Sequence, residues 1–259
     1  MKVAILAGGL GSRLAELAGS RAKALVRIGE HPILWHLIRY YCHFGYHEFV
    51  VALGHQGDSV RAYFGEGAYR LEHTGKPSLQ RWRNEASIVD LVETGQGTEN
   101  GGRIKRLAPF LDGKTFMLTW CDGLADIDLH ALLAFHRQHG RLATLTAVHP
   151  PGRFGRLDLA GDLVRSFEEK TTSEHEWING AFFVLEPGVL ERIDGDRARF
   201  EHDVLSQLAR DGELMAYRHG SFWRCVDTPK EAEELNVLWR NGAPWKIWEA
   251  SDAGAGDRQ

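Results

Sequence analysis

The chain opens with Met1-Lys2-Val3-Ala4-Ile5-Leu6-Ala7-Gly8-Gly9, an apolar run that ends in two glycines. A short, continuous apolar run bounded by glycines is typical of a strand buried on both faces, as in a parallel sheet. The segments that follow predict a helix, a strand and a second helix, at residues 32–41, 49–53 and 58–64. This alternation indicates a parallel sheet with crossover helices.

The remaining segments continue the alternation of strands and helices. The strands are expected at residues 115–120, 142–148, 157–159, 163–167, 180–185 and 221–226, and the helices at residues 129–139, 189–193, 201–210 and 230–240. The strands at 157–159 and 163–167 form a predicted hairpin. Residues 65–83 are poor in aliphatic side chains and are expected to be loop or edge structure.

These elements predict one α/β domain over residues 1–250. We expect a mixed, mainly parallel sheet with flanking helices and a smaller antiparallel C-terminal portion. Residues 251–259 are expected to be a frayed tail.

The composition excludes several classes of protein. The 259 residues are 43% hydrophobic and 25% charged, with a net charge of −4, so neither a nucleic-acid nor an anionic-membrane surface is expected. The three cysteines, Cys42, Cys121 and Cys225, have no CxxC spacing, which argues against a disulfide framework and a structural zinc site. No secretory signal and no membrane span is expected, and a cytoplasmic location fits this pattern.

A glycine-rich loop, Gly8-Gly9-Leu10-Gly11-Ser12-Arg13, follows the first predicted strand. Its glycines let the backbone approach a ligand closely, so that several N–H groups can point at phosphate oxygens. The dinucleotide fingerprint fails because residue 14 is Leu14, and the Gly-Lys-Ser/Thr of a P-loop is missing here. A tight turn between strand and helix is the alternative. The position favours a ligand site, since ligands bind at the carboxyl ends of strands in open parallel sheets.

Two cationic side chains lie close to glycines in the sequence. Lys23 follows Gly11 by twelve residues and has small and apolar neighbours. Arg103 ends the run Asn100-Gly101-Gly102-Arg103, which is expected to be a second glycine-rich turn. Either side chain can pair with a phosphate. For each of them, a solvated surface side chain is the alternative.

Two aspartates stand at the ends of predicted strands. Asp122 follows the strand at 115–120 and precedes Gly123, and Asp227 ends the strand at 221–226. A strand-end aspartate is usually a turn former or a helix N-cap, and a predicted helix follows Asp227 closely. However, Mg²⁺ in phosphoryl chemistry is typically held by one or two carboxylates together with substrate phosphates. The two aspartates therefore form a candidate Mg²⁺ site.

The stretch from Leu6 to Arg13 resembles the Gly-Gly-x-Gly-Ser/Thr-Arg signature of the sugar-phosphate nucleotidyltransferases. Further segments resemble the glucose-1-phosphate cytidylyltransferase subgroup and extend the resemblance to about Glu249. These segments are Pro32-Ile33-Leu34-Trp35-His36, Thr94-Gly95, Gly101-Gly102-Arg103-Ile104-Lys105-Arg106, Pro150-Pro151-Gly152-Arg153-Phe154-Gly155, Ile178–Leu185 and Gly242-Ala243-Pro244-Trp245-Lys246. The resemblance implies a Rossmann-like nucleotidyltransferase fold.

The resemblance also implies roles for individual residues. Those that would bind the nucleotide are Leu6, Ala7, Gly8, Gly9, Gly11, Ser12, Arg13, Lys23, Thr98, Arg103, Cys121 and Asp122. Those that would contact the sugar are Lys170, Asn179 and Gly180, and those that would hold Mg²⁺ are Asp122 and Asp227. The residues with an implied catalytic role are Arg13, Lys23, Asp122 and Lys170.

The implied reaction joins a nucleoside triphosphate, CTP in this subgroup, to glucose 1-phosphate or a related sugar phosphate. An oxygen of the sugar phosphate would attack the α-phosphorus and pyrophosphate would leave, so that catalysis would rest on positioning and charge neutralisation. Arg13 and Lys23 would neutralise the pyrophosphate, Lys170 would orient the sugar phosphate, and Mg²⁺ would bridge the two reacting phosphates. Members of the subgroup are oligomeric, which implies a homo-oligomer.

Several residues near the implied site depart from the family pattern. Arg21-Ala22-Lys23-Ala24-Leu25 stands where the family has Lys-Pro-Lys-Pro-Met, and Trp120-Cys121 replaces Tyr-Gly before the aspartate. Thr171 replaces a proline, and Ala181 replaces the second glycine after the sugar-contacting asparagine. The alternatives are therefore a different phosphorylated acceptor, a different base, or a catalytically silent regulatory protein that binds nucleotide sugars.

The cysteines beside the two aspartates have a simpler interpretation. Cys121 and Cys225 each lie within two residues of a candidate metal ligand, but no Cys/His spacing supports metal ligation by either. Both are interpreted as core or pocket-wall residues.

Overall fold

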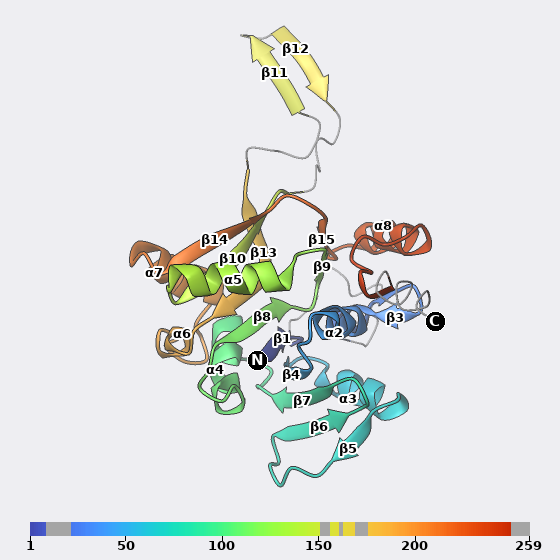
Figure 1. Ribbon diagram of the computed structural model, residues 1–259. Helices are drawn as coiled ribbons and strands as arrows, with labels where there is room; N and C mark the ends of the chain where they lie inside the picture. The colour runs from blue at the N-terminus through green and yellow to red at the C-terminus, as the bar shows by residue number, and fades with distance from the viewer. Residues whose placement is uncertain (9–21, 151–155, 161–162, 169–175, 250–259) are drawn as a thin grey trace, which may run out of the picture.

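The computed structural model describes residues 1–8, 22–150, 156–160, 163–168 and 176–249 (Figure 1). Within these ranges, a sheet of nine strands in the order β14-β10-β13-β8-β1-β4-β7-β6-β5 forms the centre of the protein. Helices lie on both faces of the sheet (Figure 1). The predicted α/β class with a mixed sheet is confirmed.

The first predicted strand lies in the middle of the sheet. It and its parallel neighbours are β1 (Lys2–Leu6), β4 (Glu48–Leu53), β8 (Phe116–Trp120) and, beyond β4, β7 (Ile88–Glu93). Val3 and Ile5 belong to one hydrophobic cluster, and Ala4 and Leu6 belong to another. Because successive side chains of a strand point to opposite faces, the apolar run is buried on both sides.

Five more strands extend the sheet on both sides of its parallel centre, and some of their pairings are antiparallel. Beyond β8 and beyond β7 lie β13 (Ile178–Leu185), β10 (Ala143–Val148), β14 (Leu214–His219), β6 (Leu79–Arg83) and β5 (Arg70–Glu72). β13 runs antiparallel to both β8 and β10, whereas β14 is parallel to β10, and β6 is antiparallel to β7 and β5. Antiparallel pairing is therefore present on both sides of the parallel centre and is not confined to the C-terminal portion.

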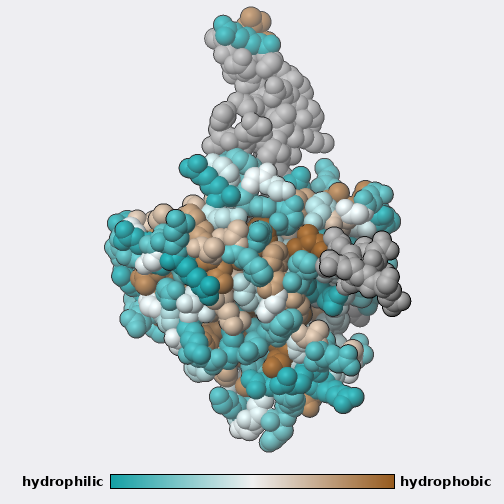
Figure 2. Space-filling view, in the orientation of Figure 1, coloured by the Kyte–Doolittle hydropathy of each residue, from teal (hydrophilic) through white to brown (hydrophobic). Residues whose placement is uncertain are grey.

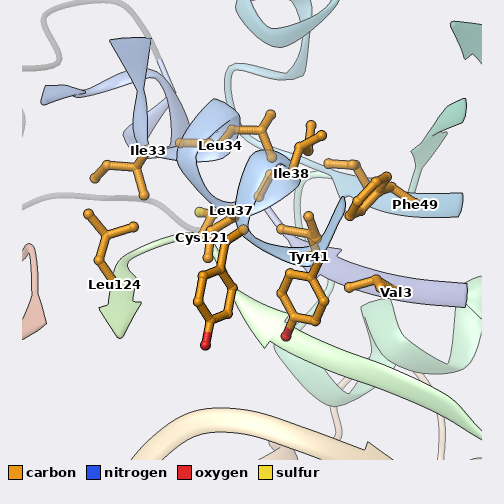
Figure 3. Packing of buried hydrophobic residues seen from close by; sticks show 14 of the residues in the cluster. Val3, Ile33, Leu34, Leu37, Ile38, Tyr41, Phe49, Cys121 and Leu124 are labelled. Carbon is orange, nitrogen blue, oxygen red and sulfur yellow. The ribbon is translucent and has the colours of Figure 1, made fainter. Parts of the chain in front are cut away.

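Helix α2 (Ile33–His43) covers one face of the sheet. Figure 3 shows its apolar side chains, among them Leu37 and Tyr41, gathered near Val3 of β1 and Phe49 of β4. The sequence predicts Pro32 in the first helical turn, but Pro32 occupies the N-cap position, one residue earlier. Its fixed φ suits either place.

The other helices divide between the two faces according to the cluster that they join. The helices that share a cluster with α2 are α3 (Gly57–Glu66), α5 (Leu129–His139) and α8 (Pro229–Arg240). Those that contribute to the opposite cluster are α4 (Asn100–Leu107), α6 (Gly188–Glu191), the π-helical η4 (Phe200–Leu205) and α7 (Ser206–Arg210). The short 3₁₀ helices are η2 (Lys23–Leu25) and η3 (Ala108–Phe110).

Among the described residues, three short strand pairs lie outside the main sheet. They are β2 (Arg27–Ile28) with β3 (His31–Pro32), β9 (Gly123–Ala125) with β15 (Trp223–Cys225), and β11 (Arg156–Ala160) with β12 (Leu163–Glu168). The last pair is the predicted hairpin, and it projects away from the body of the protein (Figure 1). Hydrophilic residues dominate the face shown in Figure 2. None of the helices in the described ranges is long and apolar enough to span a membrane.

The segment that follows α8 returns to α2 through buried tryptophans. Trp245 and Trp248 are almost fully buried and lie close to the ring of His36. His36 Nε2–H donates to the carbonyl of Ile28 at 2.9 Å, and His36 Nδ1 accepts a hydrogen bond from Trp245 Nε1 at 3.4 Å. The bond that Nδ1 accepts requires the neutral ring, and burial lowers the pKa of His36 to about 4, although the bond to Ile28 opposes this shift.

Candidate active site

Lys23, Asp122 and Asp227 come together although they lie far apart in the sequence. The Nζ atom of Lys23 is 2.9 Å from Asp122 Oδ2 and 2.6 Å from Asp227 Oδ1. The Lys23 side chain is largely buried, and the two carboxylates are only partly exposed. The alternative that Lys23 is a solvated surface residue is therefore excluded.

The two aspartates are placed by strands that run side by side. Asp122 directly precedes β9, Asp227 follows β15 by two residues, and these strands pair in an antiparallel manner through Gly123 and Cys225. The backbone N–H of Val226 also donates to the carbonyl of Asp122 at 2.8 Å. The pairing of two short strands thus brings both carboxylates together next to the carboxyl end of β8.

Electrostatics at this point favour the charged form of the lysine. Burial by itself lowers the pKa of the Lys23 ammonium, but the charge of Asp122 and the hydrogen bonds that the ammonium donates to both carboxylates outweigh this effect. The net pKa of Lys23 lies above its ordinary value. A permanent positive charge therefore sits between two carboxylates, which is an arrangement suited to binding a polyanion in the presence of a metal ion.

The alternative that Asp227 caps the following helix is wrong. The N-cap of α8 is Thr228, whose side chain accepts from the backbone N–H of Glu231 at 3.2 Å. The carboxylate of Glu231 in turn accepts from the backbone N–H groups of Thr228 and Asp227 at 2.9 and 2.8 Å. This capping box satisfies the start of the helix and leaves the Asp227 side chain available for Lys23.

Cys121 forms part of the core beneath this site. Its side chain lies near Leu37 and Leu124 in Figure 3, and the residue is almost fully buried. Burial, and secondarily the charge of Asp122, raises the pKa of the Cys121 thiol to about 12. Its place in the buried hydrophobic cluster confirms the interpretation of Cys121 as a core or pocket-wall residue. Its contact with the nucleotide stays a prediction.

The structure describes only the start of the glycine-rich loop. Leu6, Ala7 and Gly8 are described, whereas Gly9, Gly11, Ser12 and Arg13 lie outside the described residues, as does Lys170. A Cβ atom on Gly8 would lie 2.9 Å from both Arg103 Nη1 and the backbone nitrogen of Gly54. A glycine is needed here because neighbouring strand ends and a buried guanidinium crowd the backbone.

Arg103 lies beneath the strand ends and is almost fully buried. Its Nη1 donates to Gly95 O at 2.7 Å, to Thr94 Oγ1 at 2.8 Å and to Leu53 O at 3.2 Å. The alternative of a solvated surface arginine is therefore excluded. In this structure, Arg103 holds the ends of β4 and β7 together, and its contact with the nucleotide stays a prediction, as does that of the nearby, buried Thr98.

The expected glycine-rich turn at residues 100–103 is wrong, because these residues form the first turn of α4. A Cβ atom on Gly101 would lie 2.5 Å from Ala198 O, and one on Gly102 would lie 2.6 Å from the Cα of Asp196. The two glycines therefore let a distant segment cross the helix closely. Glycine has a low helix propensity, but a larger residue at either position would clash with the crossing segment.

The described sugar-side residues lie at the start of β13. Asn179 Oδ1 accepts from the backbone N–H of Ala181 at 2.9 Å, and Gly180 O accepts from Trp223 Nε1 at 2.8 Å. Ala181, which replaces a family glycine, has a φ of 61°. This positive φ explains why glycine suits the position, and the hydrogen bond that Ala181 N–H donates to Asn179 supports the strained backbone.

Sequence reasoning missed the residues that hold the loop between β7 and α4. Arg106 donates to Thr94 O at 3.0 Å and to both carboxylate oxygens of Asp196, at 2.9 and 2.6 Å. Arg106 belongs to a segment that carries the family resemblance, so a signal for it was present in the sequence. Asp196 carries no motif that could have identified it.

Comparison with known proteins gives a consistent result. Residues 2–242 match the family model described as "Nucleotidyl transferase". The chain is 42% identical over 257 residues to "Glucose-1-phosphate cytidylyltransferase" of Salmonella typhimurium, a match that covers 96% of this chain and 100% of that protein. It is 37% identical over 262 residues to "Probable glucose-1-phosphate cytidylyltransferase" of Bacillus subtilis, with the same coverage.

Solved structures share the fold. HddC from Yersinia pseudotuberculosis matches with a TM-score of 0.69 at 21% identity, over 92% of this chain and 99% of that chain. A second match, titled as a putative glucose-1-phosphate thymidylyltransferase from Bacillus anthracis, has a TM-score of 0.69 at 17% identity over 93% and 96% of the two chains. At these identities the likeness establishes the fold alone, and it confirms the predicted Rossmann-like architecture.

Proposed function

The chain belongs to the nucleotidyl transferase family, and from that premise we propose that it joins CTP to glucose 1-phosphate, giving CDP-glucose and pyrophosphate. The choice of substrates is supported by the names of the relatives that are 42% and 37% identical over nearly the whole chain. A different base or acceptor has no comparable support.

The single observation that carries the proposal is the position of Lys23 between Asp122 and Asp227. The site lies at the carboxyl end of β8, next to Gly8 at the end of β1, which is where open α/β sheets bind ligands. A catalytically silent binding protein would not need a lysine and two carboxylates that converge on one point. The alternative of a silent regulatory protein is therefore disfavoured.

The reaction requires positioning and charge neutralisation more than proton transfer. An anionic oxygen of the sugar phosphate attacks the α-phosphorus of CTP and forms a new P–O bond. The bond from the α-phosphorus to the oxygen that bridges to the β-phosphate breaks, and pyrophosphate leaves with the electron pair. Lys23 stabilises the negative charge that develops on the phosphates, and no general base is needed.

Asp122 and Asp227 suit a magnesium ion. Carboxylate oxygens are ligands that Mg²⁺ prefers, and both carboxylates already converge on one positive charge. Within the described ranges, no group of three or more His, Cys, Asp and Glu side chains could hold a metal by itself. Substrate phosphates and water would therefore supply the other ligands. When bound, Mg²⁺ would supply charge stabilisation and orientation for the phosphate oxygens.

The proposal also includes a homo-oligomer that works in the cytoplasm. The resemblance to an oligomeric subgroup supports the homo-oligomer. The small number of cysteines supports a reducing compartment such as the cytoplasm. Light scattering of the purified protein would measure the oligomeric state.

The test is a set of pyrophosphate-release assays with purified protein and Mg²⁺. CTP, UTP, GTP and dTTP are each combined with glucose 1-phosphate and with mannose 1-phosphate. We expect CTP with glucose 1-phosphate to give the highest kcat/KM. Absence of pyrophosphate release from every pair would refute the transferase proposal, whereas release from another pair alone would refute only the choice of substrates.

A further inference from the structure

The loop that joins β7 to α4, residues 94–99, is held by two arginines of the same helix. Arg103 donates from Nη1 to Gly95 O at 2.7 Å and from Nη2 to Gln96 O at 3.4 Å. Arg106 donates from Nη1 to Thr94 O at 3.0 Å. Three successive carbonyls of the loop therefore receive hydrogen bonds from guanidinium groups one helical turn apart.

Arg106 is itself held by a segment that is distant in the sequence. Its Nε and Nη2 atoms lie 2.9 and 2.6 Å from the two carboxylate oxygens of Asp196, which is the bidentate geometry that fixes a guanidinium most firmly. The backbone carbonyl of Asp196 also accepts from the N–H of Glu99 at 2.8 Å, at the end of the same loop. Asp196 thus contacts the loop both directly and through Arg106.

More bonds tie helix α4 to residues 193–201, which we call the bracing segment. Asn100 Oδ1 accepts from the backbone N–H of Phe200 at 2.8 Å, and Asn100 Nδ2 donates to Glu201 Oε2 at 2.5 Å. Lys105 Nζ donates to the carbonyl of Ile193. The close contacts at Gly101 and Gly102 belong to the same interface. Hydrogen bonds and close backbone contacts therefore join the helix to the bracing segment at several points.

The loop borders the place where the glycine-rich loop begins. The guanidinium of Arg103 contacts the backbone at both Gly8 and Gly54, so a Cβ atom on Gly54 would lie 2.1 Å from Nη1. Thr98, a residue proposed to contact the nucleotide, is buried within the same loop. A shift of Thr94 or Gly95 would displace Thr98 and Arg103 together.

We propose that Arg106 and Asp196 are positioning residues for the nucleotide, because their pairing holds the loop at residues 94–99 in the form that receives CTP. This inference rests on the proposed function. The pair does not touch the reacting phosphates and acts through Thr94, Thr98 and Arg103. Its role concerns nucleotide affinity and not the chemical step.

A comparison of CTP affinity with the melting temperature distinguishes a positioning role of the Arg106–Asp196 pair from a role in the stability of the whole protein. Both side chains are roughly half-exposed, and exposed ion pairs contribute little to the stability of a protein. Without the Arg106–Asp196 pair, however, the loop at residues 94–99 would be less well ordered in the free protein. The nucleotide would then have to order the loop when it binds, which weakens binding. Loss of the pair should therefore change CTP affinity far more than it changes the melting temperature.

The test uses Asp196→Asn, Arg106→Gln and the double variant in the full-length protein. The matched control is Glu72→Gln, which breaks the pair with Arg83 at the far edge of the sheet, where the exposure of the two side chains is similar. Calorimetry measures the Kd for CTP with Mg²⁺, steady-state assays give kcat and the KM of each substrate, and thermal unfolding gives Tm.

We expect each single variant to raise the Kd and KM for CTP about tenfold, with kcat, the KM of glucose 1-phosphate and Tm little changed. The double variant should be no worse than the singles, and Arg106→Lys should restore part of the affinity. Equal CTP affinity in wild type and variants would overturn the inference, as would a uniform loss of kcat, both KM values and Tm. Failure of the wild-type protein to bind CTP would instead overturn the proposed function on which the inference rests.

Discussion

The ammonium nitrogen of Lys23 lies 2.6 Å from Oδ1 of Asp227, although 204 positions separate the two residues in the chain. Asp122 supplies the second carboxylate at 2.9 Å. The same two carboxylates are the ones proposed to hold Mg²⁺. If Mg²⁺ binds at this site as proposed, Lys23 and the metal ion would compete for the same oxygens.

This competition predicts an unusual result for Lys23→Met. Without the ammonium, two carboxylates face each other and attract a divalent ion more strongly, so metal affinity in the absence of nucleotide should rise about tenfold. Titration with Mn²⁺, followed by electron paramagnetic resonance, measures this affinity. Lys230→Met, which changes an exposed lysine of α8, is the control and should bind Mn²⁺ as the wild type does. Equal or weaker Mn²⁺ binding by Lys23→Met would show that the ammonium and the ion do not compete.

The capping box of α8 predicts a stability effect next to the site. Thr228→Ala removes the hydroxyl that accepts from Glu231 N–H, which should lower the free energy of unfolding by about 1 kcal/mol. Urea denaturation measures this change. Thr228→Ser keeps the hydroxyl and should stay close to wild type. If the alanine and serine variants were equally stable, the cap would have no energetic role.

The sequence could predict the centre of the sheet because local signals and tertiary structure agree there. The apolar run from Val3 to Ala7 needs burial on both faces, and only a central strand provides it. The helix predicted at residues 129–139 matches α5 at both ends, because Asp128 caps its first turn and Gly140, with a φ of 63°, ends it. Each of these features lies within a few residues of the element that it defines.

Strand β7 could not be predicted in this way. Its apolar run is interrupted by Asp90, a residue that strands disfavour. The structure buries Asp90 and pairs it with Arg81 on β6 through two hydrogen bonds of 2.7 Å. The charge is acceptable only because of a partner on a neighbouring strand, and that partner cannot be identified from the local sequence.

In the candidate site, too, some features follow from the local sequence and others depend on distant parts of the chain. Lys23, Asp122 and Asp227 were predictable from the family resemblance, and the two aspartates also from their places at strand ends, and the structure brings all three together. The role of Gly101 and Gly102 was not, because it depends on the backbone of residues 196–198, which crosses the helix there. A glycine pair that faces a ligand and one that faces another part of the chain look alike in sequence.

The crossing of α4 by the bracing segment predicts a large effect for Gly102→Ala. The new Cβ would lie 2.6 Å from backbone atoms of Asp196, which cannot move as a flexible side chain could, so the free energy of unfolding should fall by about 2 kcal/mol or more. Gly220→Ala is the control, because nothing lies within 4 Å of its Cβ position. Urea denaturation compares the two. A Gly102→Ala variant as stable as its control would contradict the close crossing.

The buried ring of His36 predicts a dependence of stability on pH. The folded-state pKa is about 4, below the ordinary value of 6.5, so between these values the unfolded chain binds more protons than the folded one. Stability is therefore fully present above pH 6.5 and is lost as the pH falls toward 4, by about 3 kcal/mol in total.

The measurement is the free energy of unfolding at several pH values for wild type and His36→Gln. The wild type should lose stability more steeply than the variant as the pH falls from 7 to 4, whatever the stability of the variant at neutral pH. Parallel profiles would show that His36 does not titrate differently in the folded and unfolded chains.

The most direct test of the site is the formation of CDP-glucose by wild type and by Asp122→Asn, measured by chromatography with CTP, glucose 1-phosphate and Mg²⁺. The variant keeps the shape of the side chain and removes its charge. We expect the wild type to form CDP-glucose and pyrophosphate in equal amounts, and a folded Asp122→Asn variant to be slower by about 100-fold or more. Equal rates for the two proteins would contradict the assignment of this site.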